Sequence, residues 1–227
     1  MIKAGIDQDA ITALFSKATA RQGEMLRNAV AAGTLKALQE RELTLENMRR
    51  VLKAMTVATS AGLELNSARP TTITSMLMRS VEGMDAALGK AVDANRTALR
   101  QFMDLGVGLQ SEQMQAALGN LEKIEGMFLS VLGKVGQASA APLANPWQQV
   151  FNATRNSGTG SGEQASLVVA QLVEQSHAAL RKGRAANVRA AQAMMDSYAA
   201  LVSGVLLGMS EGIVASGKET ATRAGKK

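Results

Sequence analysis

Apolar residues recur at steps of three and four along most of this chain, and that spacing is typical of amphipathic helices. The clearest stripe, over residues 72–105, keeps a heptad spacing: Leu77, Val81, Met84, Leu88, Ala91, Asn95, Ala98, Phe102 and Leu105. Asn95 is its one polar member, and such a residue can fix helix register at some cost in stability. Aromatic residues make up only 3% of the chain, and β-branched residues are also sparse, so strands are disfavoured. The pattern predicts an all-α fold, a bundle of long helices with coiled-coil-like packing.

Turn and cap residues divide this pattern into five main helices and a central linker. Residues 1–137 are expected to form a four-helix N-terminal region. Its first helix covers residues 6–42, and the second runs from a Thr44 cap to about Asn66. The third covers residues 72–105, and the fourth follows a Ser111 cap and carries its stripe to Val135.

Residues 138–162 differ from the rest in composition, because they hold two of the three prolines and several glycines. Asn145-Pro146-Trp147 resembles a helix N-cap followed by proline at the first helical position. Ser157-Gly-Thr-Gly-Ser-Gly162 has the composition of a flexible linker. We therefore expect a flexible Pro/Gly/Ser linker that contains one short helix.

Residues 163–227 are expected to form a long C-terminal helix with a basic tail. An uninterrupted helix over residues 163–216 would be about 80 Å long and would have to pack on other helices, another chain or a surface. Small residues repeat every four positions and predict a tight helix crossing: Ala200, Gly204, Gly208, Gly212 and Ser216.

The net charge of +6 is concentrated at the C-terminal end, where residues 181–227 contain eight basic and three acidic residues. The basic residues are Arg181, Lys182, Arg184, Arg189, Lys218, Arg223, Lys226 and Lys227. Such a segment suits an anionic surface or nucleic acid, and a solvated terminus is the alternative interpretation.

No catalytic, cofactor or metal site can be assembled from the sequence, so we expect a protein that is not an enzyme. Cysteine is absent and His177 is the only histidine, which excludes disulfide scaffolds and Cys/His zinc sites. Glu174-Gln-Ser-His177 has the spacing of a di-iron ligand pair, but one chain holds a single copy and only a homodimer could supply the second. Gly158-x-Gly160-x-x-Glu163 lacks the third glycine of a dinucleotide fingerprint. Glu122 and Glu125 are interpreted as a solvated face.

Neither a signal peptide nor a transmembrane span is expected, which predicts a cytoplasmic protein. The N-terminus has no apolar signal core, since Asp7 and Asp9 come too early. The longest membrane candidate, Ser197 to Ser210, has fourteen uncharged residues, whereas spanning a bilayer takes about 20.

The chain resembles phasins, the helical proteins that coat polyhydroxyalkanoate granules in bacteria. The resemblance is carried by Ala/Gln/Met-rich helices, by Asn145-Pro-Trp-Gln-Gln149 and by Gln192-Ala-Met-Met-Asp-Ser-Tyr-Ala-Ala-Leu201. The middle stretch, from Val81-Glu-Gly-Met-Asp-Ala-Ala-Leu88 through Glu125-Gly-Met-Phe-Leu129, is also similar to an uncharacterised family of bacterial helical proteins. Together these likenesses cover about residues 40–215.

The resemblance implies adsorption to a polyester granule through apolar helix faces. The expected contact residues are Trp147, Val150, Phe151, Leu201, Val205, Leu206 and Met209. The partner would be the granule surface or another helical protein, and a homo-oligomer is compatible with the long helices. The alternative is a structural coiled-coil protein that binds nucleic acid or a protein partner through its basic C-terminal segment.

Overall fold

The computed structural model describes residues 23–64, 70–105, 107–109, 111–181 and 198–209. Every regular element in these ranges is a helix, which confirms the all-α prediction. The helices are α2 (Gly23–Gln39), α3 (Leu45–Glu64), α4 (Pro70–Asp104), α5 (Glu112–Glu122), α6 (Ile124–Ala138), α7 (Ala141–Ser157), α8 (Gly160–Arg181) and a segment over residues 198–209. None of them is long and apolar enough to cross a bilayer.

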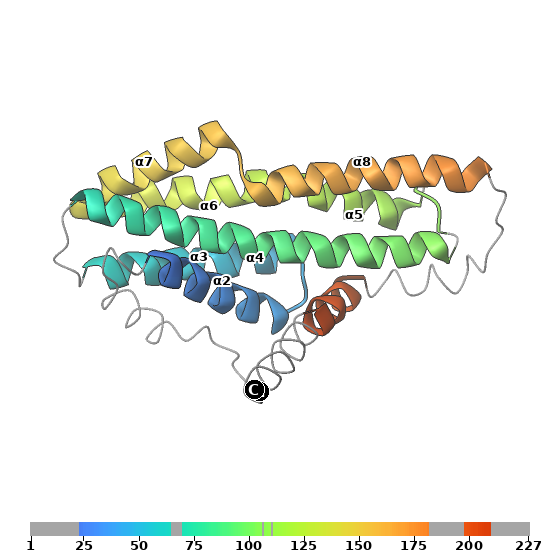
Figure 1. The fold of residues 1–227 in the computed structure, drawn as a ribbon, viewed down its shortest axis with the longest axis horizontal. Coiled ribbons are helices and arrows are strands. Elements are labelled where there is room, and N and C mark those ends of the chain that lie inside the picture. The colour runs from blue at the N-terminus through green and yellow to red at the C-terminus, as the bar shows by residue number, and fades with distance from the viewer. Residues whose placement is uncertain (1–22, 65–69, 106, 110, 182–197, 210–227) are drawn as a thin grey trace, which may run out of the picture.

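Helix α4 is the longest element and the centre of the bundle, as Figure 1 shows. It packs against α2, α7 and α8, while α3 packs mainly against α6. Its predicted stripe is buried from Leu77 to Phe102, whereas Leu105 lies beyond the helix and is 43% exposed. Further α4 residues outside the stripe are also buried: Met76, Ser80, Ala87, Val92, Ala94 and Leu99. The buried face is wider than the two positions per heptad of a coiled-coil seam, because α4 has neighbours on several sides.

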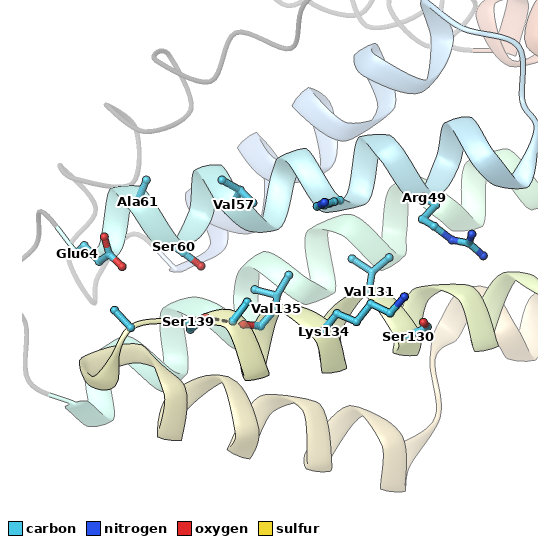
Figure 2. Close-up of a pocket in the computed structure, with 13 residues that line it drawn as sticks. Arg49, Val57, Ser60, Ala61, Glu64, Ser130, Val131, Lys134, Val135 and Ser139 are labelled. Atoms are coloured by element: carbon cyan, nitrogen blue, oxygen red, sulfur yellow. Dashed lines mark hydrogen bonds between the residues drawn. The ribbon is translucent and has the colours of Figure 1, made fainter.

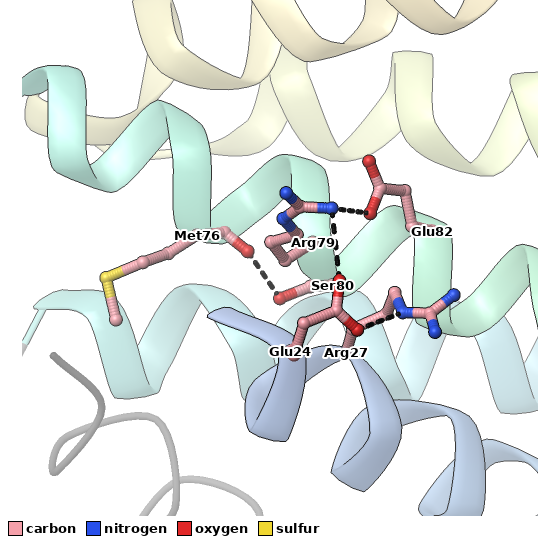
Figure 3. Close-up of polar contacts among 6 residues, drawn as sticks. All are labelled: Glu24, Arg27, Met76, Arg79, Ser80 and Glu82. Atoms are coloured by element: carbon pink, nitrogen blue, oxygen red, sulfur yellow. Dashed lines mark hydrogen bonds and ion pairs between the residues drawn. The ribbon is translucent and has the colours of Figure 1, made fainter. Parts of the chain in front are cut away.

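Helices α2 and α4 cross so closely that their backbones nearly touch. A Cβ atom at Gly83 would lie 2.5 Å from the Arg27 carbonyl oxygen and 3.0 Å from Val30 Cβ. Figure 3 shows the ion pairs beside this crossing, where Arg79 lies 3.6 Å from Glu24 and 2.8 Å from Glu82. These pairs are partly solvated and contribute little, so the close apolar contact holds the two helices together.

The caps expected at Thr44 and Ser111 are confirmed. The Thr44 hydroxyl accepts a hydrogen bond from the Asn47 amide at 3.1 Å, and the Ser111 hydroxyl accepts one from the Met114 amide at 3.3 Å. The expected single fourth helix is wrong, because the chain breaks at Lys123 into α5 and α6. The Lys123 amide bonds back to the Asn120 carbonyl at 3.2 Å, which tightens that turn.

The expected flexible linker over residues 138–162 is also wrong, because these residues form α7 and the first turn of α8. Pro142 lies in the first turn of α7, where a missing amide proton is tolerated. Pro146 lies inside the helix, so Asn145 is not an N-cap. Helix α7 persists there because Trp147 and Val150 anchor it in the core.

The C-terminal helix does not form one straight rod. Helix α8 ends at Arg181, and residues 198–209 do not continue its axis but lie near α2, as Figure 1 shows. The small-residue row faces solvent where it is described, at Ala200, Gly204 and Gly208, and a Cβ at either glycine would meet nothing within 4 Å. The tight crossing expected on this row is therefore wrong for these residues, and Gly212 and Ser216 lie outside the described residues.

Candidate functional site

A groove of about 640 Å³ lies between α3, α6 and the turn that leads into α7 (Figure 2). Helix α3 lines it at four-residue steps, because residues four apart share one helix face: Arg49, Lys53, Val57 and Ala61. Helix α6 contributes the facing wall, which includes Ser130, Val131, Lys134, Val135 and Ala138. We call this feature the α3–α6 groove.

The α3–α6 groove combines an aliphatic wall with an uneven distribution of charge. Val57 is 47% exposed beside Val131 and Val135, so aliphatic surface is open to solvent there. Arg49 lies toward one end and Glu64 toward the other, as Figure 2 shows. The side chains of Arg49, Lys53 and Lys134 form no hydrogen bond or ion pair within the described ranges of the chain.

Trp147 is a core residue rather than a surface contact. Its side chain is fully buried, and its indole Nε1 donates a hydrogen bond to the Ser60 hydroxyl at 3.0 Å. Ser60 itself lines the groove. Val150 is also fully buried, and Phe151 is partly buried against Gly133. The expectation that Trp147 and Val150 present a surface for adsorption is therefore corrected, because packing of α7 on α4 and α6 places both in the core.

The other expected contact residues lie on the helix over residues 198–209, which contains no charged side chain. Leu206 is buried, which corrects its assignment to a free surface, and Val202 is buried beside it. Leu201, Val205 and Met209 are partly buried against the core. The outward face of this helix is formed by Ala200, Gly204, Leu207 and Gly208, of which Leu207 is 41% exposed.

Polar side chains dock this helix on the bundle. The Ser203 hydroxyl accepts a hydrogen bond from the buried Leu43 amide at 3.1 Å and lies 2.9 Å from the Arg41 carbonyl oxygen. The Tyr198 hydroxyl donates to Asn95 Oδ1 at 2.8 Å, so the polar residue of the predicted stripe has a specific partner. Burial raises the pKa of Tyr198 well above its ordinary range.

Two of the sequence features with possible chemistry, Glu125 and the glycine motif that begins at Gly158, meet at the N-terminal cap of α8. Glu125 accepts a hydrogen bond from the Thr159 amide at 2.9 Å, and Asp85 accepts bonds from the Gly160 and Ser161 amides at 2.8 and 3.1 Å. These carboxylates bind the amide groups at the N-terminus of α8, which are the groups that would otherwise bind a phosphate. Glu125 is therefore a cap of α8, which corrects its interpretation as part of a solvated face. Gly158 adopts a φ of 75° in the turn, a conformation that suits glycine.

The described ranges contain no cluster of three His, Cys, Asp or Glu side chains that could hold a metal ion. Of the eight basic C-terminal residues, Arg181 is the last residue of α8. The other seven lie outside the described residues: Lys182, Arg184, Arg189, Lys218, Arg223, Lys226 and Lys227.

None of the expected contact residues lines the α3–α6 groove, so sequence reasoning missed it. A signal was present, since an aliphatic Val57 follows Arg49 and Lys53 on one exposed face of an amphipathic helix. That signal became a groove only through the pairing of α3 with α6, which are separated in sequence by all of α4 and α5.

Comparison with known proteins gives one match. No curated protein and no solved structure matches the chain. A family model described as a family of unknown function matches residues 1–215, which is nearly the whole chain. On the strength of that match, the chain belongs to the family DUF6781.

Proposed function

We propose that the protein is a non-enzymatic, phasin-like coat protein that adsorbs to polyhydroxyalkanoate granules in the cytoplasm through residues 198–209. The observation that carries the proposal is the uncharged outward face of this helix, formed by Ala200, Gly204, Leu207 and Gly208. A face without charges can leave water without the desolvation cost of an ion. The resemblance to phasins, which includes residues of this helix, favours a polyester surface.

Adsorption begins with the outward face and proceeds by release of the helix from the bundle. Burial of Leu207 against the polyester contributes about 1.5–3 kcal/mol. The hydrogen bonds that dock the helix contribute about 0.5–1.5 kcal/mol each, because water replaces them when the helix moves. Val202 and Leu206 then turn toward the polyester and stay buried. The free energies of the docked and the adsorbed helix are therefore nearly equal, and adsorption is reversible.

Fluorescent fusions in bacteria that accumulate polyhydroxyalkanoate, compared with cells without granules, test the proposal. The wild-type protein is expected to form rings around granules and to be diffuse in cells that lack them. Leu207→Asp is expected to abolish the rings, because it places a charge on the adsorbing face. Leu207 suits this test better than Leu206, since a charge at buried Leu206 would also disturb docking.

The matched control is Leu105→Asp, which makes the same change at a site of similar exposure beyond α4. This variant is expected to keep the rings, and circular dichroism should show unchanged helix content for both variants. Diffuse wild-type signal in cells with granules would contradict the proposal. Signal on the nucleoid in both kinds of cell would instead favour nucleic-acid binding through the basic C-terminal segment.

A further inference from the structure

We propose that the α3–α6 groove binds one aliphatic carboxylate, the anion of a free fatty acid. This inference does not depend on granule adsorption, because the groove shares no residue with the helix over residues 198–209.

The size and lining of the groove suit an alkyl chain. Its volume of about 640 Å³ lies within the range of about 300–1,000 Å³ that is typical of small-molecule sites. Val57, Val131 and Val135 line it with aliphatic surface. From Arg49 to Glu64 the α3 wall is about 22 Å long at 1.5 Å per residue, so it can accompany an extended chain.

The charges of the groove suit a single anionic head group. Arg49, Lys53 and Lys134 line it, and their side chains have no ion-pair partner among the described residues. A carboxylate between these cations would gain charge-assisted hydrogen bonds. Glu64 stands toward the opposite end, as Figure 2 shows, so repulsion would orient the carboxylate toward Arg49.

The same charges could also attract an acidic amphipathic helix from a partner protein. A stable protein interface buries about 800 Å² on each partner, and the apolar lining here is restricted to a few valines and alanines. The groove therefore fits a small amphiphile better, and binding of a protein in its place is an outcome that the test distinguishes.

The test uses the purified full-length chain and sodium laurate below its micelle concentration. Calorimetry is expected to show saturable binding of one laurate per chain. The single tryptophan provides a second readout, because Trp147 donates its hydrogen bond to Ser60 in the groove wall. Its fluorescence is expected to change over the same concentration range. A dodecyl trimethylammonium salt, which has the same chain length and the opposite charge, is expected not to bind.

Two sets of variants locate the site. The double variant Lys53→Gln/Lys134→Gln is expected to weaken laurate binding at least tenfold. The matched control Lys36→Gln/Lys90→Gln removes the same charge from exposed lysines of α2 and α4 outside the groove and should bind like wild type. Val57→Asp places an acid in the groove wall and is expected to abolish binding, and the exposure of Val57 lets the fold tolerate it.

Three results would overturn the inference. They are binding without saturation, equal binding of the cationic amphiphile, and equal weakening by the control pair. A chain that ignores laurate but binds an acidic amphipathic peptide at Lys53 and Lys134 would assign the groove to a protein partner instead. Each of these results leaves the granule experiment untouched, because Leu207 is not part of the groove.

Discussion

Helix α2 and the helix over residues 198–209 both contact α4, but they are held there in different ways. Helix α2 meets α4 at Gly83, where backbone and aliphatic groups are in close contact. The second helix buries Val202 and Leu206 and is attached through hydroxyl groups as well, since Tyr198 bonds to Asn95 of α4 and Ser203 bonds to the Leu43 amide. Close apolar contact has no substitute in water, whereas each hydrogen bond can be replaced by one to solvent. We therefore expect residues 198–209 to separate from the bundle more readily than α2 does.

The largest expected effect comes from filling the α2–α4 contact. Gly83→Ala would place a Cβ atom 2.5 Å from the Arg27 carbonyl oxygen, and this atom belongs to rigid helix backbone. We expect the free energy of unfolding to fall by about 3 kcal/mol, as for overpacked cores. Urea denaturation followed by circular dichroism measures this change.

Gly119→Ala in α5 is the control for helix propensity, because a Cβ atom there meets nothing within 4 Å. This substitution should stabilise the chain by about 0.5–1 kcal/mol. If both variants shifted the denaturation midpoint equally, the close contact at Gly83 would not be a determinant of stability.

A smaller and local effect is expected when the docking hydroxyl is removed. Ser203→Ala leaves the buried Leu43 amide without its acceptor, which costs about 1–3 kcal/mol. Because 1.4 kcal/mol corresponds to tenfold in an equilibrium, amides of residues 198–209 should exchange hydrogen about tenfold faster. Amides of α4 should keep their wild-type rates.

Ser166→Ala in α8 is the matched control, since the Ser166 hydroxyl bonds to the Gly162 carbonyl of its own helix. It should leave exchange in residues 198–209 unchanged. Faster exchange throughout the bundle in Ser203→Ala would show that residues 198–209 unfold with the core and would remove the distinction between the two helices.

The docking of residues 198–209 should also weaken at alkaline pH. Burial raises the pKa of Tyr198 above its ordinary value of 10.0, so the docked state favours the protonated phenol. The stabilisation is therefore complete below about pH 10 and is lost as the pH rises above that value. Tyr198 is the only tyrosine, so phenolate absorbance reports this group alone.

Native protein should form phenolate at higher pH than the urea-unfolded chain. Ser203→Ala should move the native curve toward the unfolded one, while Ser166→Ala should not. Coincident curves for native and unfolded wild-type protein would mean that the Tyr198 hydroxyl is not held in the buried position.

The parts of the fold that depend on local spacing were predictable, and the parts that depend on distant contacts were not. The period of α4 and the caps at Thr44 and Ser111 follow from neighbouring residues, and all are confirmed. The interpretation of residues 138–162 as a linker was wrong because local composition cannot show that Trp147 is buried or that Asp85 and Glu125 cap α8. The α3–α6 groove was missed for the same reason, since neither helix forms it alone.

The smallest effect is expected from a substitution that tests whether the contact between α2 and α4 is apolar along its whole length. The Thr34 hydroxyl on the inner face of α2 is buried and has no hydrogen-bond partner in the part of the chain that the structure describes. Thr34→Val replaces it with a methyl group of similar shape and removes the cost of keeping it from water, so stability should rise by up to about 1 kcal/mol. Thr59→Val in α3 is the matched control, because the buried Thr59 hydroxyl donates to the Met55 carbonyl at 2.8 Å and its loss should lower stability by about 0.5–1.5 kcal/mol. If Thr34→Val lowered the urea midpoint as Thr59→Val does, the Thr34 hydroxyl would have an acceptor, and α2 would be held partly as residues 198–209 are held.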